Sequence, residues 1–431
     1  MRLLFVFVFL SSVAFGQNVH IPDANFKKCL VENAKINTNG DNEIQLSEAK
    51  SYSDTIDCSN REIEDLTGIE AFTNLTSLNC SKNKYKLKSI DVSKNTALTS
   101  LNCERNKLSS LDVSKNTALT SLNCNSNYRL TSLDVSKNTA LTSLNCSYSK
   151  LTSLDVSKNT ALTKLFCHGN ALTSLDVSKN TVLTHLDCSS SNITSLDVSK
   201  NTTLTSLNCS YSKLTSLDIS KNIALTTLDC HESINLTSLD VSKNTALAKL
   251  YCGGNKFTSL DISKNIALTI LDCPSSTNLT SLDVSKNTAL TSLNCETNNL
   301  TSLDVSKNTN LTYLNCLSNQ IRTLDVSKNT ALAKLYCGGN KLTSLDVSKN
   351  TALTKLYCYS NQLTSLDVSK NSALTELYCD RNQLTLLDVS KNTLLNKLQV
   401  RENPLNCVTV APKMSPRILH NLNVFGITKC D

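Results

Sequence analysis

The sequence predicts a repeat solenoid, in which about 17 coils of 21 or 22 residues stack as parallel β-structure behind a short helical N-terminal cap. The main observation is that Asp-(Val/Ile)-Ser-Lys-Asn recurs 15 times, from Asp91 to Asp388, at spacings of 21 or 22 residues. A cysteine recurs in step with it from Cys58 to Cys379. The 431 residues include 19 Cys but only 9 Gly, 5 Pro and no Trp, the bias expected of one motif copied many times.

Residues 1–16 are predicted to be a secretory signal peptide. Arg2 precedes an apolar run over residues 3–10, and small residues end the segment at Gly16, where we expect cleavage. No later stretch approaches the roughly 20 apolar residues that a membrane-spanning helix needs. We therefore expect no membrane span, and a mature protein that is secreted or held at the cell surface.

Residues 17–55 are predicted to cap the first coil. Asp23 is placed to cap a helix whose Phe26, Cys29 and Leu30 share one face. A loop similar to an EF-hand follows, and its candidate calcium ligands are Asn37, Asn39, Asp41, Glu43 and Glu48. Asparagine replaces the usual Asp at its first position and the usual Gly at its sixth. Calcium binding and a degenerate loop kept as a cap both stay open, and no other cofactor is expected.

Residues 56–405 are predicted to form the coils. In a representative coil, Leu101 and Cys103 alternate with outward-facing residues, as a strand requires, and Leu111 and Val113 repeat this pattern. Asparagines follow both runs and mark turns. We expect two short parallel strands per coil, or one strand and one extended or 3₁₀ segment.

The general pattern L-x-x-L-x-C-x-x-N-x-L matches the leucine-rich-repeat signature. Over roughly residues 56–405 the chain resembles the secreted bacterial leucine-rich-repeat proteins of the internalin-like kind. The coil that begins at Ile56 is the most similar to their pattern, whereas the Asp-Val-Ser-Lys-Asn coils depart from it. The resemblance therefore implies the fold but does not transfer the partners of those proteins.

Cysteine usage divides into two classes. Cys407 and Cys430 flank the closing segment, residues 406–431, and an exported protein can join such a pair by a disulfide, which we predict. The 16 ladder cysteines occupy inward positions that an apolar residue could fill, as Val400 does in the last coil. We therefore predict that they are small, buried and reduced.

Composition argues against nucleic-acid binding and catalysis. The net charge is +7, but the 15 motifs each contribute one Asp and one Lys that cancel, and no Arg-rich run occurs. Neither a Ser-His-Asp arrangement nor a glycine-rich phosphate loop is present, so an enzyme is not expected. One alternative stays open, a metal site built from His168, His185 and Asp187.

Variation between coils is concentrated at the outward positions of the first strand, which should stack into three columns on a concave face. We predict that a monomer binds a protein or glycan through this face, in adhesion or another host or surface interaction. The alternatives are a structural surface or matrix rod, and ice or crystal-surface binding by the threonine columns. The candidate ligand-binding residues are Tyr313, Lys334, Tyr336, Lys355, Tyr357, Tyr359, Glu376, Tyr378, Lys397 and Arg401.

Overall fold

The computed structural model describes residues 17–276, 278–412, 418 and 428–430, so the predicted signal peptide lies outside the described residues. The chain divides into two compact units, residues 1–151 and 152–431. Both are built as parallel β-solenoid, and the chain has about 17 turns of it, which confirms the predicted fold.

The first unit contains the cap and the first coils. Its helices are α1 (Ala24–Val31) and α2 (Leu46–Ser51), with a 3₁₀ turn, η1 (Ile69–Ala71). Its strands are β1 (Thr55–Asp57), β2 (Ser77–Asn79), β3 (Ser100–Asn102), β4 (Ser121–Asn123) and β5 (Ser143–Asn145). They pair in parallel and in chain order, with the central residue of each strand opposite that of the next.

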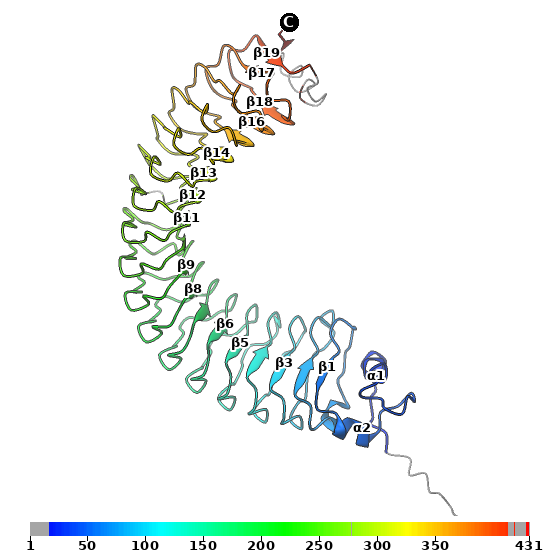
Figure 1. The fold of residues 1–431 in the computed structure, drawn as a ribbon. Helices are drawn as coiled ribbons and strands as arrows, with labels where there is room; N and C mark the ends of the chain where they lie inside the picture. Colours follow the sequence, from blue (N-terminus) through cyan, green and yellow to red (C-terminus); the bar gives the residue numbers. More distant parts are fainter. Residues whose placement is uncertain (1–16, 277, 413–417, 419–427, 431) are drawn as a thin grey trace, which may run out of the picture. The chain divides into compact units, whose positions relative to one another are not determined.

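The second unit continues the same pattern. Its main strands are β6 (Lys164–Phe166), β7 (His185–Asp187), β8 (Ser206–Asn208), β9 (Thr227–Asp229), β10 (Lys249–Tyr251), β11 (Ile270–Asp272), β12 (Ser292–Asn294), β13 (Tyr313–Asn315), β14 (Lys334–Tyr336), β15 (Lys355–Tyr357), β16 (Glu376–Tyr378) and β18 (Lys397–Gln399). They pair in parallel in chain order. Within this unit the strands lie on the inner side of the curved stack (Figure 1).

Each described coil has one strand in its first half, whereas its second half is made of turns and irregular backbone. This is the second of the two predicted arrangements. The exception is β17 (Asp388–Val389), which pairs with β19 (Cys407–Val410), and β19 pairs in turn with β20 (Thr428–Lys429). This small sheet lies at the C-terminal end of the second unit. A disulfide joins Cys407 in β19 to Cys430, the residue after β20, with their Cα atoms 5.1 Å apart.

Leucines, cysteines and valines from every coil fill the core. In one coil of the second unit, Leu335, Cys337 and Val347 are each fully buried. The ladder cysteines are likewise buried and free of disulfides. Burial raises the pKa of these thiols, for example that of Cys316 to about 12. Because the thiolate is the reactive form, the ladder is a set of inert apolar rungs at neutral pH.

Buried asparagines connect neighbouring coils, two in most coils and one where a serine such as Ser212 takes the first position. In the turn after the Asp-Val-Ser-Lys sequence, Asn308 Nδ2 donates to the carbonyl oxygens of Val284 and Asn287, at 3.0 and 2.9 Å. The aspartate of the motif accepts the N–H of the serine two residues later, as Asp325 does from Ser327 at 2.8 Å. The invariance of this half of the repeat is therefore structural.

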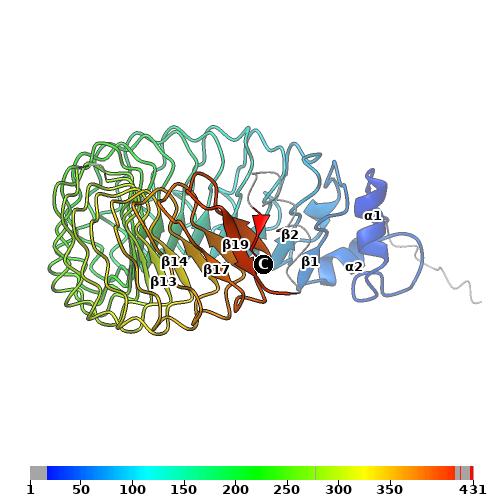
Figure 2. The same cartoon turned by 90° about the horizontal axis from the view of Figure 1, so that it is seen from above.

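The cap fits the first coil as predicted. The carboxylate of Asp23 accepts N–H groups at the start of α1, from Asn25 and Phe26 at 2.9 Å. Its other oxygen accepts the N–H of Glu64 in the first coil at 2.7 Å. Phe26, Cys29 and Leu30 are buried on one face of α1, which confirms the predicted amphipathic helix. Figure 2 shows α1 and α2 at the β1 end of the first unit. No helix among the described residues is both long and apolar enough to cross a membrane.

Candidate binding surface

Three columns of side chains cover the strand face of the second unit. The first column holds the residue before the central leucine of each strand, the second holds the residue between that leucine and the cysteine, and the third holds the residue after the cysteine. Because neighbouring strands pair in register, residues of one column lie directly opposite each other. These columns contain the side chains that differ from coil to coil.

The structure places all ten predicted ligand-binding residues on one end of this face, over β13–β18 and the turns that follow these strands. We call this set the tyrosine surface. Tyr313, Lys334, Lys355, Glu376 and Lys397 belong to the first column, Tyr336, Tyr357 and Tyr378 to the second, and Tyr359 and Arg401 to the third.

The rings of the tyrosine surface pack against one another. Tyr313 meets Tyr336 edge to face, with centroids 5.6 Å apart. Tyr336 and Tyr357 are 4.5 Å apart with a tilt of 31°, and Tyr357 and Tyr378 are 4.3 Å apart and nearly parallel at 8°. Stacking covers ring faces and leaves ring edges exposed. The result is an ordered, half-buried aromatic strip.

Glu376 anchors this strip. Only 7% of its surface is exposed, and its carboxylate accepts from Lys355 at 3.0 Å, Lys397 at 3.1 Å and the Tyr357 hydroxyl at 2.5 Å. The hydrogen bond from Tyr357 and those from the two lysines outweigh burial, and they lower the pKa of Glu376 to about 2. Burial and the bond to Glu376 raise the pKa of Tyr357. Glu376 is therefore charged, and Tyr357 keeps its proton, at any physiological pH.

Sequence reasoning missed one residue of the surface, Gly338. A Cβ atom at this position would lie 3.0 Å from the ring of Tyr359, so the glycine makes room for that ring. The usable signal was the Gly338-Gly339 pair itself, because glycine is scarce in this chain. Glu376 was among the predicted ligand-binding residues, but its bonds to the two lysines and to Tyr357 were not predicted. The available signal was that Glu376 is the single acidic residue in a run of first-column lysines.

A second cluster lies over β6–β10. His168 Nδ1 is 3.2 Å from the carboxylate of Asp187, and His231 Nδ1 is 2.5 Å from that of Asp229. The open alternative of a metal site at His168, His185 and Asp187 gains no support, because His185 Nδ1 bonds the Thr184 hydroxyl at 2.9 Å. Among the described residues, no three His, Cys, Asp or Glu side chains are placed to hold a metal ion.

The oxygens of the EF-hand-like loop are already occupied by protein donors. Glu48 accepts from Thr38 through both N–H and hydroxyl, from the N–H of Asn39 and from the N–H of Gln45, at 2.7–3.3 Å. Asp41 accepts from the side-chain amides of Asn39 and Gln45, both at 2.9 Å. Amide N–H groups thus point where a calcium ion would need oxygens. We therefore expect the loop to act as a cap rather than as a calcium site.

We expect calorimetric titration of residues 17–431 with calcium chloride to give no binding heat up to about 1 mM, the weak end of the range for extracellular EF-hand-like modules. The physical reason is that calcium entry would break the hydrogen bonds that hold Glu48 and Asp41. A saturable heat that disappears in the Glu48→Gln variant would contradict this and establish the loop as a calcium site.

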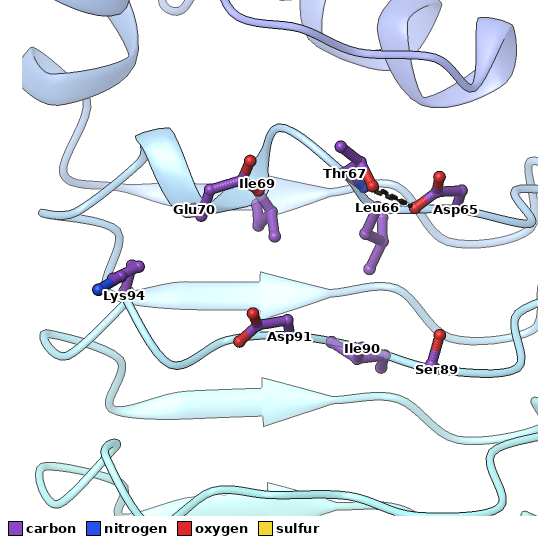
Figure 3. Close-up of a pocket in the computed structure, with 9 residues that line it drawn as sticks. All are labelled: Asp65, Leu66, Thr67, Ile69, Glu70, Ser89, Ile90, Asp91 and Lys94. Carbon is purple, nitrogen blue, oxygen red and sulfur yellow. Dashed lines mark hydrogen bonds between the residues drawn. The ribbon is translucent and has the colours of Figure 1, made fainter.

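A hollow of about 310 Å³ in the first unit is formed by the second halves of neighbouring coils (Figure 3). Asp65, Asp91 and Lys94 contribute its charges together with Glu70. A similar hollow of about 320 Å³ occurs in the second unit, where Asp218 lies across from Asp240 and Lys243. Because the second halves of neighbouring coils build both, with Asp91 and Lys94 of one hollow at the motif positions of Asp240 and Lys243 of the other, the hollow in Figure 3 is a property of the coil and not a dedicated site.

The chain is similar to leucine-rich-repeat proteins of known sequence and structure. The family model for the leucine-rich-repeat domain of the endo-β-N-acetylglucosaminidase EndoS matches residues 22–180. No curated protein matches significantly. The functional domain of InlJ from Listeria monocytogenes, a structure that includes a cysteine ladder, is 39% identical with a TM-score of 0.72, over 88% of this chain and 79% of that one. A leucine-rich-repeat protein of Leptospira interrogans is 23% identical with a TM-score of 0.67, over 90% of this chain and 97% of that one.

Proposed function

Because the chain belongs to the internalin-like family of bacterial leucine-rich-repeat proteins, we propose that it is an exported monomer whose tyrosine surface binds a protein ligand, in adhesion or another contact at a cell surface. The observation that carries the proposal is the anchored tyrosine strip. It is a local departure from a scaffold that is otherwise copied from coil to coil. A structural rod would not require that departure.

The chemistry of the tyrosine surface suits recognition. Tyrosine and arginine are enriched among the residues that dominate binding energies at protein interfaces. Ring stacking and the bonds of Glu376 hold the side chains in place before any ligand arrives. Little side-chain entropy is therefore lost on binding, which favours affinity.

The ring geometry favours a protein over a glycan at this surface. A sugar ring binds aromatic residues by lying on an exposed ring face, whereas the faces of Tyr336 and Tyr357 are covered by their neighbours. The ring edges, together with Lys334 and Arg401, instead offer apolar contact, hydrogen bonds and charge to a polypeptide surface.

The proposal is tested by affinity capture on immobilised residues 17–431. We expect proteins captured from extracts of candidate partner cells to be lost, with at least about tenfold weaker binding, when Tyr336, Tyr357 and Tyr378 are all changed to serine. The matched control is Tyr85→Ser with Tyr128→Ser, an exposed ring pair 5.4 Å apart in the first unit. Circular dichroism and urea unfolding verify that each variant folds.

The outcomes are distinct. Capture that survives the triple substitution contradicts the proposal and favours a structural rod. Capture that survives protease treatment of the extract but not periodate oxidation identifies a glycan ligand and also contradicts it. Loss with the triple variant and with protease, but not with the control pair, supports a protein ligand at the tyrosine surface.

A further inference from the structure

A third hollow, of about 200 Å³, opens on the strand face over β6–β10. Its floor carries short side chains, Ser206, Asn208 and Thr227, and two aromatic residues of the second column, Phe166 and Tyr251, stand at its two ends. Within the described part of the chain, neither of these rings packs against another ring. Unlike the stacked tyrosines farther along the face, they present uncovered aromatic surface to the hollow.

Two carboxylates line the hollow between those rings, so that the second column reads Phe166, Asp187, Asn208, Asp229, Tyr251 from β6 to β10. This order is nearly symmetric about Asn208. Each aspartate stands next to an aromatic residue, and the asparagine separates the two aspartates.

Both carboxylates are held in place. His168 Nδ1 is 3.2 Å from Asp187 Oδ2, while Ser189 donates its N–H and hydroxyl to the other oxygen of Asp187. Asp229 Oδ1 accepts from the N–H and Nδ1 of His231 at 3.2 and 2.5 Å. Asp229 Oδ2 has no donor within the described residues. Burial of Asp187 is outweighed by its bonds from His168 and Ser189, which lower the pKa of this carboxyl, so it is charged at neutral pH. The bond to Asp229 raises the pKa of His231.

We propose that this hollow is a binding site for basic side chains, with arginine preferred, on an extended segment of a protein ligand. A guanidinium group can donate two parallel hydrogen bonds to a carboxylate and stack on a neighbouring aromatic face. Asp229 and Tyr251 supply both partners, because Asp229 Oδ2 is open to a donor. At Asp187 and Phe166 the guanidinium would share carboxylate oxygens that already accept from His168 and Ser189. The site rests on the proposed protein-binding function but not on the tyrosine surface.

The spacing specifies the ligand further. Asp187 and Asp229 are two coils apart, about 10 Å at roughly 4.8 Å per coil. An extended segment in the polyproline II conformation rises about 3.1 Å per residue with three residues per turn, so its side chains at positions i and i+3 lie on the same face, about 9 Å apart. Lys164 and Lys249 share coils with Phe166 and Tyr251, are exposed, and form no ion pair within the described residues. Their positive charges would repel basic residues of the ligand at the two ends of the hollow. The site is therefore limited to the coils between them, and a longer run of basic residues is disfavoured.

The test uses the whole mature chain and synthetic peptides. The probe is an eight-residue peptide of glycine and serine with arginine at positions 3 and 6. Its binding to the chain is measured by calorimetry or fluorescence anisotropy at low salt. The neutral comparison peptide carries citrulline in place of arginine. We expect binding of the arginine peptide alone, weakened at least about tenfold by Asp187→Asn with Asp229→Asn. The matched control, Asp197→Asn with Asp240→Asn, makes the same charge change in the constant motif and should leave binding unchanged.

Each other result overturns the proposal. No binding of the arginine peptide, equal binding of the citrulline peptide, or equal loss in both double variants would exclude a specific basic-residue site. Binding of neutral oligosaccharides that is lost in the Asp187 and Asp229 variant, without peptide binding, would identify a glycan site instead. Protein capture at the tyrosine surface is measured separately, with the variant in which Tyr336, Tyr357 and Tyr378 are changed to serine. A negative result for the hollow therefore does not imply a negative result for the tyrosine surface.

Discussion

Replacing Asn308 with alanine is expected to lower the free energy of unfolding of the second unit by about 2 kcal/mol. The Asn308 amide donates to two buried carbonyl oxygens of the preceding coil, Val284 O and Asn287 O. In the alanine variant both oxygens keep a backbone donor, the N–H of Asn287 to Val284 O at 3.0 Å and the N–H of Leu290 to Asn287 O at 3.1 Å. The cost is therefore that of two lost hydrogen bonds, about 0.5–1.5 kcal/mol each. The Asn308 Oδ1 atom, buried and without a hydrogen-bond partner, offsets part of this cost when it is removed.

The measurement is urea unfolding followed by circular dichroism, with hydrogen exchange to locate the weakened coils. Asn310→Ala is the matched control, because Asn310 also donates to the preceding coil, at 3.2 Å to Thr288 O, but in an exposed position. We expect its cost to stay below about 1 kcal/mol, since water can replace the bond. Similar costs at both positions would show that the buried asparagine column does not hold the coils together.

The repeat made the fold predictable from sequence alone. A period of 21 or 22 residues fixes which side chains face inward in every coil, so Leu335, Cys337 and Val347 could be placed in the core without any knowledge of their neighbours. Asp23 and the apolar face of α1 were equally readable, because capping and amphipathicity are local properties. One strand per coil could not be chosen over two, because both patterns alternate in the sequence and only the backbone path separates them.

The candidate sites were predictable in position but not in chemistry. In-register stacking implied that Tyr336, Tyr357 and Tyr378 would be neighbours, but ring tilt depends on side-chain rotamers that sequence does not specify. The bonds of Glu376 to two lysines and a tyrosine depend on rotamers in the same way. The hollow over β6–β10 required a further condition, short side chains between two rings, which appears only when the columns are assembled.

The Glu376→Gln variant is expected to loosen the tyrosine surface and to remove an acid-sensitive part of its stability. Wild-type Glu376 has its pKa lowered from 4.5 to about 2, chiefly by the bond from Tyr357 and despite burial. Its charged form therefore stabilises the fold fully above about pH 4.5, and this contribution is lost as pH falls towards 2. The shift corresponds to at most about 3 kcal/mol. Urea unfolding between pH 5 and pH 2 should show a smaller acid-dependent loss in the variant than in the wild type.

A second readout separates this role from a general loss of stability. Glu376 raises the pKa of Tyr357, so glutamine at position 376 should return one tyrosine towards its usual range in an ultraviolet titration. Glu402→Gln is the control, because Glu402 pairs with Arg381 at 3.0 Å while remaining mostly exposed. This variant should change neither the loss of stability between pH 5 and pH 2 nor the tyrosine titration. If Glu376→Gln matched this control in both measurements, the anchoring role would be wrong. If it altered both measurements but left ligand capture intact, the strip would be a structural ladder and the proposed binding site would lie elsewhere on the strand face.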